Sequence, residues 1–106
     1  MGKIQLLTDK NFEQRIKGAG IVLIDFYADW CMPCKQLTSI LEEIAEENKD
    51  IKIYKIDVEE NTKYVQKYNI NSIPMLILLN NKEVAYKITG LTSKEDIQEK
   101  INKVKD

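Results

Sequence analysis

The sequence predicts an α/β fold in which a mixed central β-sheet is sandwiched by α-helices, in the order β-α-β-α-β-α-β-β-α. Two patterns predict it. Apolar runs alternate with segments of helical periodicity, and only a short turn separates the last two apolar runs. The chain has 106 residues, 43% of them hydrophobic and 31% charged, as in a globular protein. We therefore expect residues 1–106 to form a single domain.

The first predicted elements are a strand, a helix and a second strand. Residues 4–7 are typical of a short strand, and Thr8 or Asp9 can then cap a helix that ends at about residues 18–20. Residues 21–28 form a continuous apolar run that one aspartate interrupts. Such a run is typical of a strand with both faces covered, as in the middle of an α/β sheet.

A long helix, a strand and a shorter helix are predicted next. The long helix follows the cysteines, and its apolar residues recur at spacings of three and four: Leu37, Ile40, Leu41, Ile44 and Ala45. Residues 51–58 contain the apolar residues of another strand, after which Asn61 or Thr62 can cap a helix. The apolar residues of that shorter helix are Val65 and Tyr68.

The C-terminal part is predicted to be a β-hairpin followed by a helix. Residues 75–79 are typical of a buried strand, residues 80–82 of a turn, and residues 84–88 of the returning strand. Thr92 and Ser93 each precede an acidic residue by three positions, which is the pattern of a capping box at the start of a helix. The inward residues of this last helix are Ile97, Ile101 and Val104.

Charge and hydropathy exclude several classes of function. The 16 basic and 17 acidic residues leave a formal charge of −1, without the basic excess that nucleic-acid binding requires. The strongest apolar run, residues 21–28, is too short to span a bilayer. Residues 1–5 lack the apolar core of a signal peptide. We therefore expect a cytoplasmic protein that binds neither nucleic acid nor membrane.

The two cysteines, Cys31 and Cys34, are separated by two residues, and the chain has no histidine. A disulfide that closes so short a loop removes almost no entropy from the unfolded chain, so a purely structural bridge is disfavoured. A metal site needs further ligands, and here it would require a dimer that shares two cysteine pairs. Redox chemistry at the pair is the third alternative, and the pattern favours it.

The position of the cysteines suits redox chemistry. They lie where a buried strand leads into the long helix, and the first turn of a helix has unpaired N–H groups and the positive end of the helix dipole. Both features stabilise a thiolate, which is the species that attacks disulfides. Pro33 suits an early helical position because its missing N–H would have no partner there.

Residues 24–35 resemble the active-site segment of the thioredoxin family, and the resemblance extends over essentially the whole chain. The residues that carry it are, in order, Asp25, Trp30, Cys31, Pro33, Cys34, Lys55, Ile73, Pro74 and Gly90. The resemblance implies a thioredoxin fold and reduction of protein disulfides by dithiol–disulfide exchange through Cys31 and Cys34. It also implies that no cofactor or metal is needed beyond the reversible disulfide.

The resemblance further implies roles for individual residues. Cys31 corresponds to the exposed nucleophile and Cys34 to the buried thiol that resolves the mixed disulfide. Asp25 corresponds to a buried carboxylate that helps to deprotonate Cys34, with Lys55 close to it. Independently, a lone aspartate inside an apolar strand should have a raised pKa if it is buried. The alternatives are an Asp25 that faces water at a strand edge and a Lys55 that is an ordinary surface lysine.

A second set of residues is expected to contact the client protein: Trp30, Met32, Pro33, Ile73, Pro74 and Gly90. Pro74 resembles a cis-proline that faces the disulfide, which would leave the backbone at Ile73 open to an extended client segment. Trp30 should pack beside the cysteines. We expect Tyr27 to be an ordinary core aromatic.

The chain departs from the family pattern at three positions. Met32 stands where most thioredoxins have glycine between the cysteines, Met75 where most have threonine after the cis-proline, and Lys82 where a turn glycine is common. Met32 and Met75 could together form a soft apolar rim around the thiols. A core position explains Met75 equally well.

The resemblance also implies partners. A thioredoxin reductase or a similar donor would supply electrons to a monomer, and proteins with disulfides would be its clients. The competing class of function is a binding module with a thioredoxin fold in which the thiols are incidental.

Overall fold

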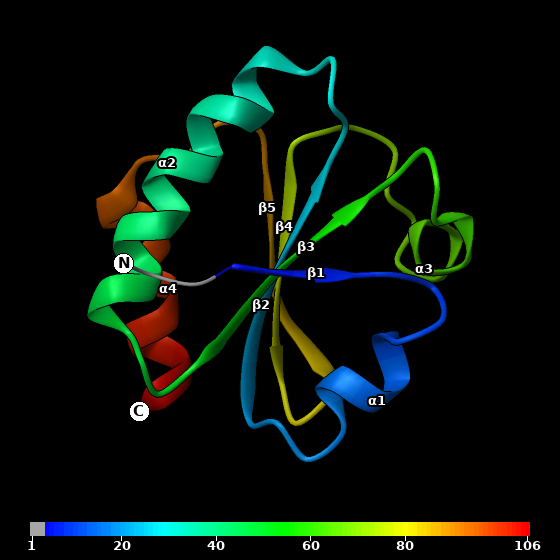
Figure 1. Ribbon diagram of the computed structural model, residues 1–106. Coiled ribbons are helices and arrows are strands. Elements are labelled where there is room, and N and C mark those ends of the chain that lie inside the picture. The colour runs from blue at the N-terminus through cyan, green and yellow to red at the C-terminus, as the bar shows by residue number, and fades with distance from the viewer. Residues whose placement is uncertain (1–3) are drawn as a thin grey trace.

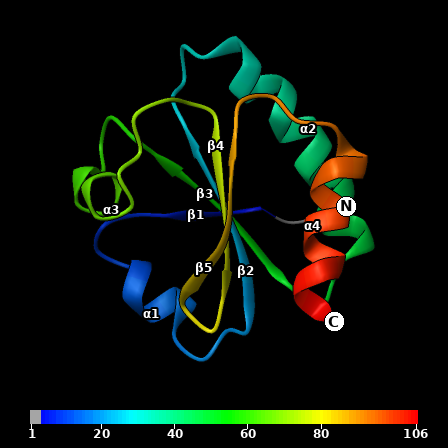
Figure 2. The same ribbon diagram turned by 180° about the vertical axis from the view of Figure 1, so that it is seen from behind.

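The computed structural model describes residues 4–106 and has a five-stranded β-sheet with helices on both faces (Figures 1 and 2). Helices α1 and α3 lie on one face of the sheet, and α2 and α4 lie on the other. The elements are β1 (Gln5–Leu7), α1 (Phe12–Ile16), β2 (Ile21–Tyr27), α2 (Met32–Glu47), β3 (Lys52–Asp57), α3 (Thr62–Lys67), β4 (Met75–Asn80), β5 (Glu83–Thr89) and α4 (Lys94–Lys105).

The sheet is mixed, and its strand order is β1-β3-β2-β4-β5. Strands β1, β3 and β2 are parallel to one another, β4 is antiparallel to β2, and β5 is antiparallel to β4. The predicted fold class and element order are therefore confirmed. Strand β2, which carries the long apolar run, lies at the centre of the sheet.

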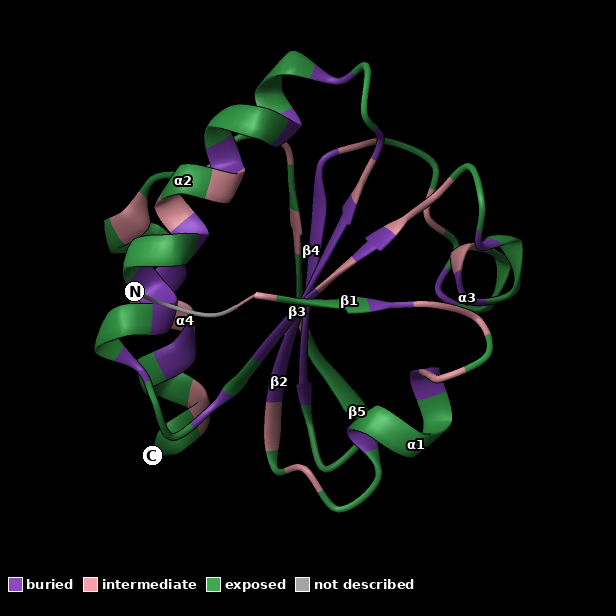
Figure 3. Ribbon diagram, in the orientation of Figure 1, coloured by how far each residue is buried: buried purple, intermediate pink, exposed green. Residues whose placement is uncertain are grey.

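Alternation along β2 divides the core into two layers, because successive side chains of a strand point to opposite faces. Ile24 packs with the residues of α1 and α3, whereas Leu23 packs with those of α2 and α4. Asp25 has the same parity as Leu23, so its side chain lies on the α2 face. Buried residues dominate the middle of the sheet (Figure 3).

Helix α1 is shorter than the sequence predicts and begins later. It starts after Asn11 and ends at Ile16, so the expected cap at Asp9 and the expected end near residues 18–20 are wrong. Thr8 caps the turn that leads into the helix, and its carbonyl accepts from the Phe12 N–H at 3.0 Å. The Asn11 N–H donates to the Thr8 hydroxyl at 3.2 Å, and the Thr8 N–H donates to the Asn11 side chain at 2.8 Å.

The caps of the later helices are partly as predicted. Ser93 caps α4, and its hydroxyl accepts from the Asp96 N–H at 3.2 Å. Asn61 occupies the cap position of α3 but makes no side-chain cap bond to that helix. The carboxylate of Asp9, far away in the sequence, accepts from the Lys63 N–H at 3.1 Å in its place.

Candidate active site

The cysteine pair lies at the N-terminus of α2, where the sequence predicts it. Cys31 is the N-cap residue, Cys34 is in the first turn, and the two are joined by a disulfide with a Cα–Cα distance of 5.2 Å. The Cys34 N–H donates to the Cys31 Sγ at 3.2 Å. Pro33 is in the first turn, where its missing N–H costs no intrahelical bond. The end of the helix therefore directs a hydrogen-bond donor at the Cys31 sulfur.

Both cysteines are buried in the disulfide form. Cys31 is 4% exposed and Cys34 is 2% exposed, and both pack with Ala28, Val58 and Ile73. The expected exposure of Cys31 is therefore wrong for this form. The physical reason is that its sulfur is turned toward the helix end, where it bonds to the Cys34 sulfur and accepts the Cys34 N–H.

Asp25 is 1% exposed, so the alternative in which it faces water is wrong. Its neighbours across the sheet are Lys55 on β3 and Leu76 on β4. Its Oδ1 atom is buried and has no hydrogen-bond partner. Burial raises the pKa of Asp25 to about 7, and the positive charge of Lys55 opposes that rise. The side chain faces α2, which is the helix that begins with the cysteines.

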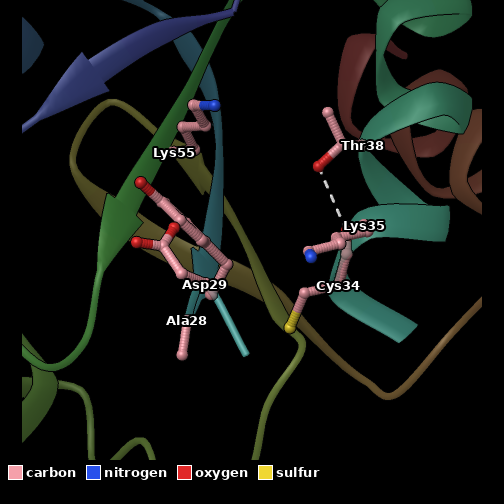
Figure 4. A pocket seen from close by; sticks show the side chains of 7 residues that line it. Ala28, Asp29, Cys34, Lys35, Thr38 and Lys55 are labelled. Carbon is pink, nitrogen blue, oxygen red and sulfur yellow. Dashed lines mark hydrogen bonds between the residues drawn. The ribbon is translucent and has the colours of Figure 1, made fainter. Parts of the chain in front are cut away.

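A cavity of about 250 Å³ opens beside Cys34 on this face (Figure 4). Its lining residues are Tyr27, Ala28, Asp29, Cys34, Lys35, Thr38 and Lys55. The Cys34 sulfur and the Lys55 side chain approach it from opposite sides, from α2 and β3. The Thr38 hydroxyl donates to the Cys34 carbonyl at 3.1 Å, which fixes the first turn of the helix.

Tyr27 is not the ordinary core aromatic that the sequence suggests. Its side chain is half-buried and lines this cavity. The Lys55 ammonium lies 5.4 Å from the centroid of its ring. Lys55 is itself half-buried, so it is not an ordinary surface lysine either. The two residues occupy neighbouring strands on the side of the sheet that faces Cys34.

A second hollow lies between Trp30 and Ile73, on the side of α3. Its lining residues are Trp30, Val58, Val65, Ile70, Asn71, Ser72 and Ile73. The Ile73–Pro74 peptide bond is cis, as expected. The Gly90 N–H donates to the Pro74 carbonyl at 2.9 Å, and Gly90 has a φ of 84°, which favours glycine. Ile73 and Gly90 are thus held on one loop cluster next to the disulfide.

Two large apolar side chains beside the disulfide are exposed. Trp30 is 66% exposed and Met32 is 64% exposed. The Trp30 indole N–H donates to the Glu59 carboxylate at 2.7 Å, and the packing of its ring beside the cysteines stays a prediction. Met75 is 5% exposed and belongs to the core, so it is not part of a rim.

Sequence reasoning missed Val58 and Glu59, although both lie at the site. They follow β3 just as Ala28 follows β2, and the Val58 N–H donates to the Tyr27 carbonyl at 2.9 Å. The carboxyl ends of neighbouring parallel strands share one edge of a sheet, where sites in α/β folds form. Applied to the ends of the two predicted strands, that rule could have placed Val58 and Glu59 at the site.

Within residues 4–106, no group of three or more cysteine, aspartate or glutamate side chains could hold a metal ion. None of the helices described there is long and apolar enough to cross a bilayer.

Comparison with known proteins gives consistent matches. The family model described as Thioredoxin matches residues 3–103. The chain is 46% identical over 102 residues to the thioredoxin of Buchnera aphidicola subsp. Acyrthosiphon pisum, with 93% of this chain and 94% of that protein covered. It is 44% identical over 97 residues to the thioredoxin of Bacillus subtilis, with 91% and 92% covered. A solved structure of a mutant thioredoxin from Halobacterium salinarum superposes with a TM-score of 0.91 at 28% identity, covering 98% of this chain and 92% of that one.

Proposed function

The chain belongs to the thioredoxin family of thiol–disulfide oxidoreductases, and from this premise we propose that it reduces disulfides of client proteins in the cytoplasm as a monomeric electron carrier. The redox group of the family is the cysteine pair, here Cys31 and Cys34. A thioredoxin reductase, the family's typical electron donor, would return the disulfide to the dithiol. Residues 1–106 would act as one domain.

The observation that carries the proposal is the hydrogen bond from the Cys34 N–H to the Cys31 sulfur. Once the disulfide is reduced, this donor and the dipole of the 16-residue helix α2 favour negative charge on Cys31. Cys34 is less well placed to carry this negative charge, because it lies inside the first turn rather than at the N-cap. Cys31 is therefore the proposed nucleophile.

The proposed reaction has two exchanges. The Cys31 thiolate attacks one sulfur of a client disulfide, a mixed disulfide forms, and the other client sulfur leaves as a thiolate that takes up a proton. The Cys34 thiolate then attacks the Cys31 sulfur and expels the second client thiolate. Two electrons pass to the client, and the Cys31–Cys34 disulfide forms.

Asp25 is proposed to accept the proton of Cys34 in the second exchange. Its carboxyl faces α2, is buried with an unpartnered oxygen, and has a pKa of about 7. A base with a pKa near the working pH is effective in proton transfer. Lys55, its neighbour on β3, stabilises the ionised form and is proposed to keep that pKa from rising further.

The client is proposed to lie across the hollow next to the cis peptide bond. An extended client segment would pair with the backbone at Ile73, beside Pro74 and Gly90. Trp30 and Met32 would contact it with their exposed side chains, and Pro33 would complete the surface at the start of α2. The exposed apolar side chains of Trp30 and Met32 support recognition of apolar segments around the client disulfide.

The experiment is trapping of a model client, insulin, by single-cysteine variants. We expect Cys34→Ser to accumulate a mixed disulfide with an insulin chain, because the resolving thiol is absent. We expect Cys31→Ser to accumulate none, and neither variant to turn over insulin with a thioredoxin reductase and NADPH. Equal trapping by both variants would contradict the assigned roles. Persistence of client binding in a variant that lacks both cysteines would favour a binding module instead.

A further inference from the structure

Four ionisable side chains form a square on the face of the sheet that is turned toward α2: Asp25, Tyr27, Lys55 and Asp57. Strands β2 and β3 are parallel and in register, with Asp25 opposite Lys55 and Tyr27 opposite Asp57. Residues that are paired in a ladder, and residues two apart on one strand, point to the same side of a sheet. Lys55 is therefore the cross-strand neighbour of Asp25, lies two residues from Asp57 on β3, and is diagonal to Tyr27.

Within this square, the ammonium of Lys55 lies over the ring of Tyr27. The distance from its nitrogen to the ring centroid is 5.4 Å, which is within the range of a cation–π interaction. Burial and the carboxylates of Asp57 and Asp29 raise the pKa of Tyr27, so the phenol stays neutral at physiological pH. The contact is thus between a cation and a neutral ring, in a cavity that also reaches the Cys34 sulfur.

We propose that Tyr27 is a positioning residue for the exchange reaction: the face of its ring holds the Lys55 ammonium beside Asp25 and so makes that carboxyl easier to ionise. The inference rests on the proposed role of Asp25 as the proton acceptor for Cys34. Without the ring, the flexible lysine side chain would extend from the cavity toward solvent or toward Asp57. Asp25 would then lose the positive charge of Lys55, which opposes the effect of its burial.

The other charged and titratable groups around the square do not supply a substitute for Lys55. Asp29, Asp57 and Glu60 are acidic, and each acts on the Tyr27 phenol in the same direction. Helix α2 contributes the Cys34 thiol, when reduced, and Lys35 at the rim of the cavity. Lys35 is exposed and is not among the charges that act on Asp25. Strand β4 offers only the apolar side chain of Leu76 next to Asp25.

The test is titration of the Asp25 carboxyl in the disulfide form by NMR with ¹³C-labelled aspartate, the signal being assigned by its absence in Asp25→Asn. We expect Tyr27→Leu to lower the acid dissociation constant of Asp25 about two- to fivefold. The matched control Tyr27→Phe, which keeps the ring and removes the hydroxyl, should leave it within error of the wild type. This titration needs no client or reductase, so it is independent of whether the proposed reductase activity is found.

A double-mutant cycle separates positioning from simple shielding. Lys55→Met should lower the same dissociation constant at least as far, and adding Tyr27→Leu to it should cause no further change. If Tyr27→Leu instead raises the dissociation constant, the ring only excludes water, and the proposal is wrong. It is equally wrong if Tyr27→Leu has its full effect in the Lys55→Met background, or if Tyr27→Phe behaves like Tyr27→Leu.

A measurement on the wild type keeps the proposal testable if the leucine variant does not fold. The ε-CH₂ protons of Lys55 should be shifted upfield by the ring current of Tyr27 and should show nuclear Overhauser contacts to its ring protons. Lys35, which lines the same cavity without a ring contact among the described interactions, is the internal control. Lysine ε-protons that resonate alike for Lys55 and Lys35 would overturn the assignment.

Discussion

Two buried polar side chains near opposite ends of α2 are treated very differently by the fold. Asn48, at the C-terminal end of the helix, is buried and uses both side-chain atoms in hydrogen bonds. It donates to the Ile44 carbonyl at 2.8 Å and to Gln98 at 2.7 Å, and it accepts from Gln98 at 2.9 Å and from Lys105 at 3.2 Å. Asp25, on the strand that leads to the other end, is equally buried but has an oxygen without any partner.

The difference separates a group that stabilises the fold from one that is kept reactive. A buried amide with all its partners contributes to stability, and its network joins α2 to α4. A buried carboxyl without full hydrogen bonding destabilises the fold when it ionises, and the same destabilisation brings its pKa close to 7. The cost in stability at Asp25 and its suitability for proton transfer have one physical cause.

The largest expected effect is that of Asp25→Asn on stability at pH 8, in the disulfide form. The folded-state pKa of about 7 exceeds the ordinary value of 3.8, so the unfolded chain ionises first as the pH rises. The wild type therefore loses stability between about pH 4 and pH 7, by roughly 4 kcal/mol in total, and the loss then stays constant. Asp25→Asn should remove this pH dependence and be more stable than the wild type at pH 8, while its turnover of insulin falls.

Denaturant unfolding followed by circular dichroism at pH 4 and pH 8 measures this effect. The matched control is Asp29→Asn, which removes an exposed carboxylate from the same neighbourhood and should change stability by less than about 0.5 kcal/mol. An Asp25→Asn variant no more stable than the wild type at pH 8 would show that the carboxyl is solvated, and the contrast with Asn48 would disappear.

The next largest effect is the loss of stability on Asn48→Ala. Truncation removes the amide that donates to the Ile44 carbonyl and to the Gln98 side-chain oxygen, which should cost about 2–3 kcal/mol at any pH between 5 and 8. The control Asn102→Ala removes an exposed side chain that bonds only to Gln98 and should cost much less. Because this network is far from the disulfide, insulin turnover per folded molecule should be unchanged. A substantial drop in that turnover would mean that the two ends of α2 are coupled.

The two polar groups also differ in how far the sequence could predict them. Asp25 stands out locally, because a single acidic residue interrupts an apolar run and its burial follows from the central strand. Asn48 could not be recognised, because its main partner Gln98 is 50 residues away and nothing local distinguishes it from a surface amide. Local patterns thus predict which residues are buried better than they predict how buried polar groups are satisfied.

The remaining errors have the same origin in long-range contacts. Asp9 has the chemistry of an N-cap and does act as one, but for α3 rather than for the next helix. Tyr64, which the sequence did not single out, is fully buried because its ring stacks on Phe12 at a centroid distance of 3.6 Å. Tyr27 was misjudged because the partner that defines its surroundings, Lys55, comes from another strand.

The smallest expected effect concerns Met32, at the N-terminal end of α2. It tests whether this exposed side chain, as well as the buried Asp25, influences the redox chemistry of the cysteines. The Met32 side chain is exposed and makes no described contact with either sulfur, whereas the helix end that stabilises the Cys31 thiolate is formed by backbone groups. Met32→Gly should therefore leave the acidity of Cys31 unchanged and shift the Cys31–Cys34 potential by about 30 mV or less, which is roughly 1.4 kcal/mol for this two-electron couple.

The rate with a thioredoxin reductase should change more than the potential does, because Met32→Gly removes apolar surface from the rim that a partner must contact and adds backbone freedom there. Thiol titration, redox equilibration with glutathione and reductase kinetics on both forms measure the three quantities. Met32→Leu is the matched control, since it keeps apolar bulk at the rim and should retain the wild-type rate. A large shift in potential with an unchanged reductase rate would assign Met32 to redox tuning. The redox potential at this end of α2 would then depend on Met32, one of the two residues between the cysteines, as well as on the buried carboxyl.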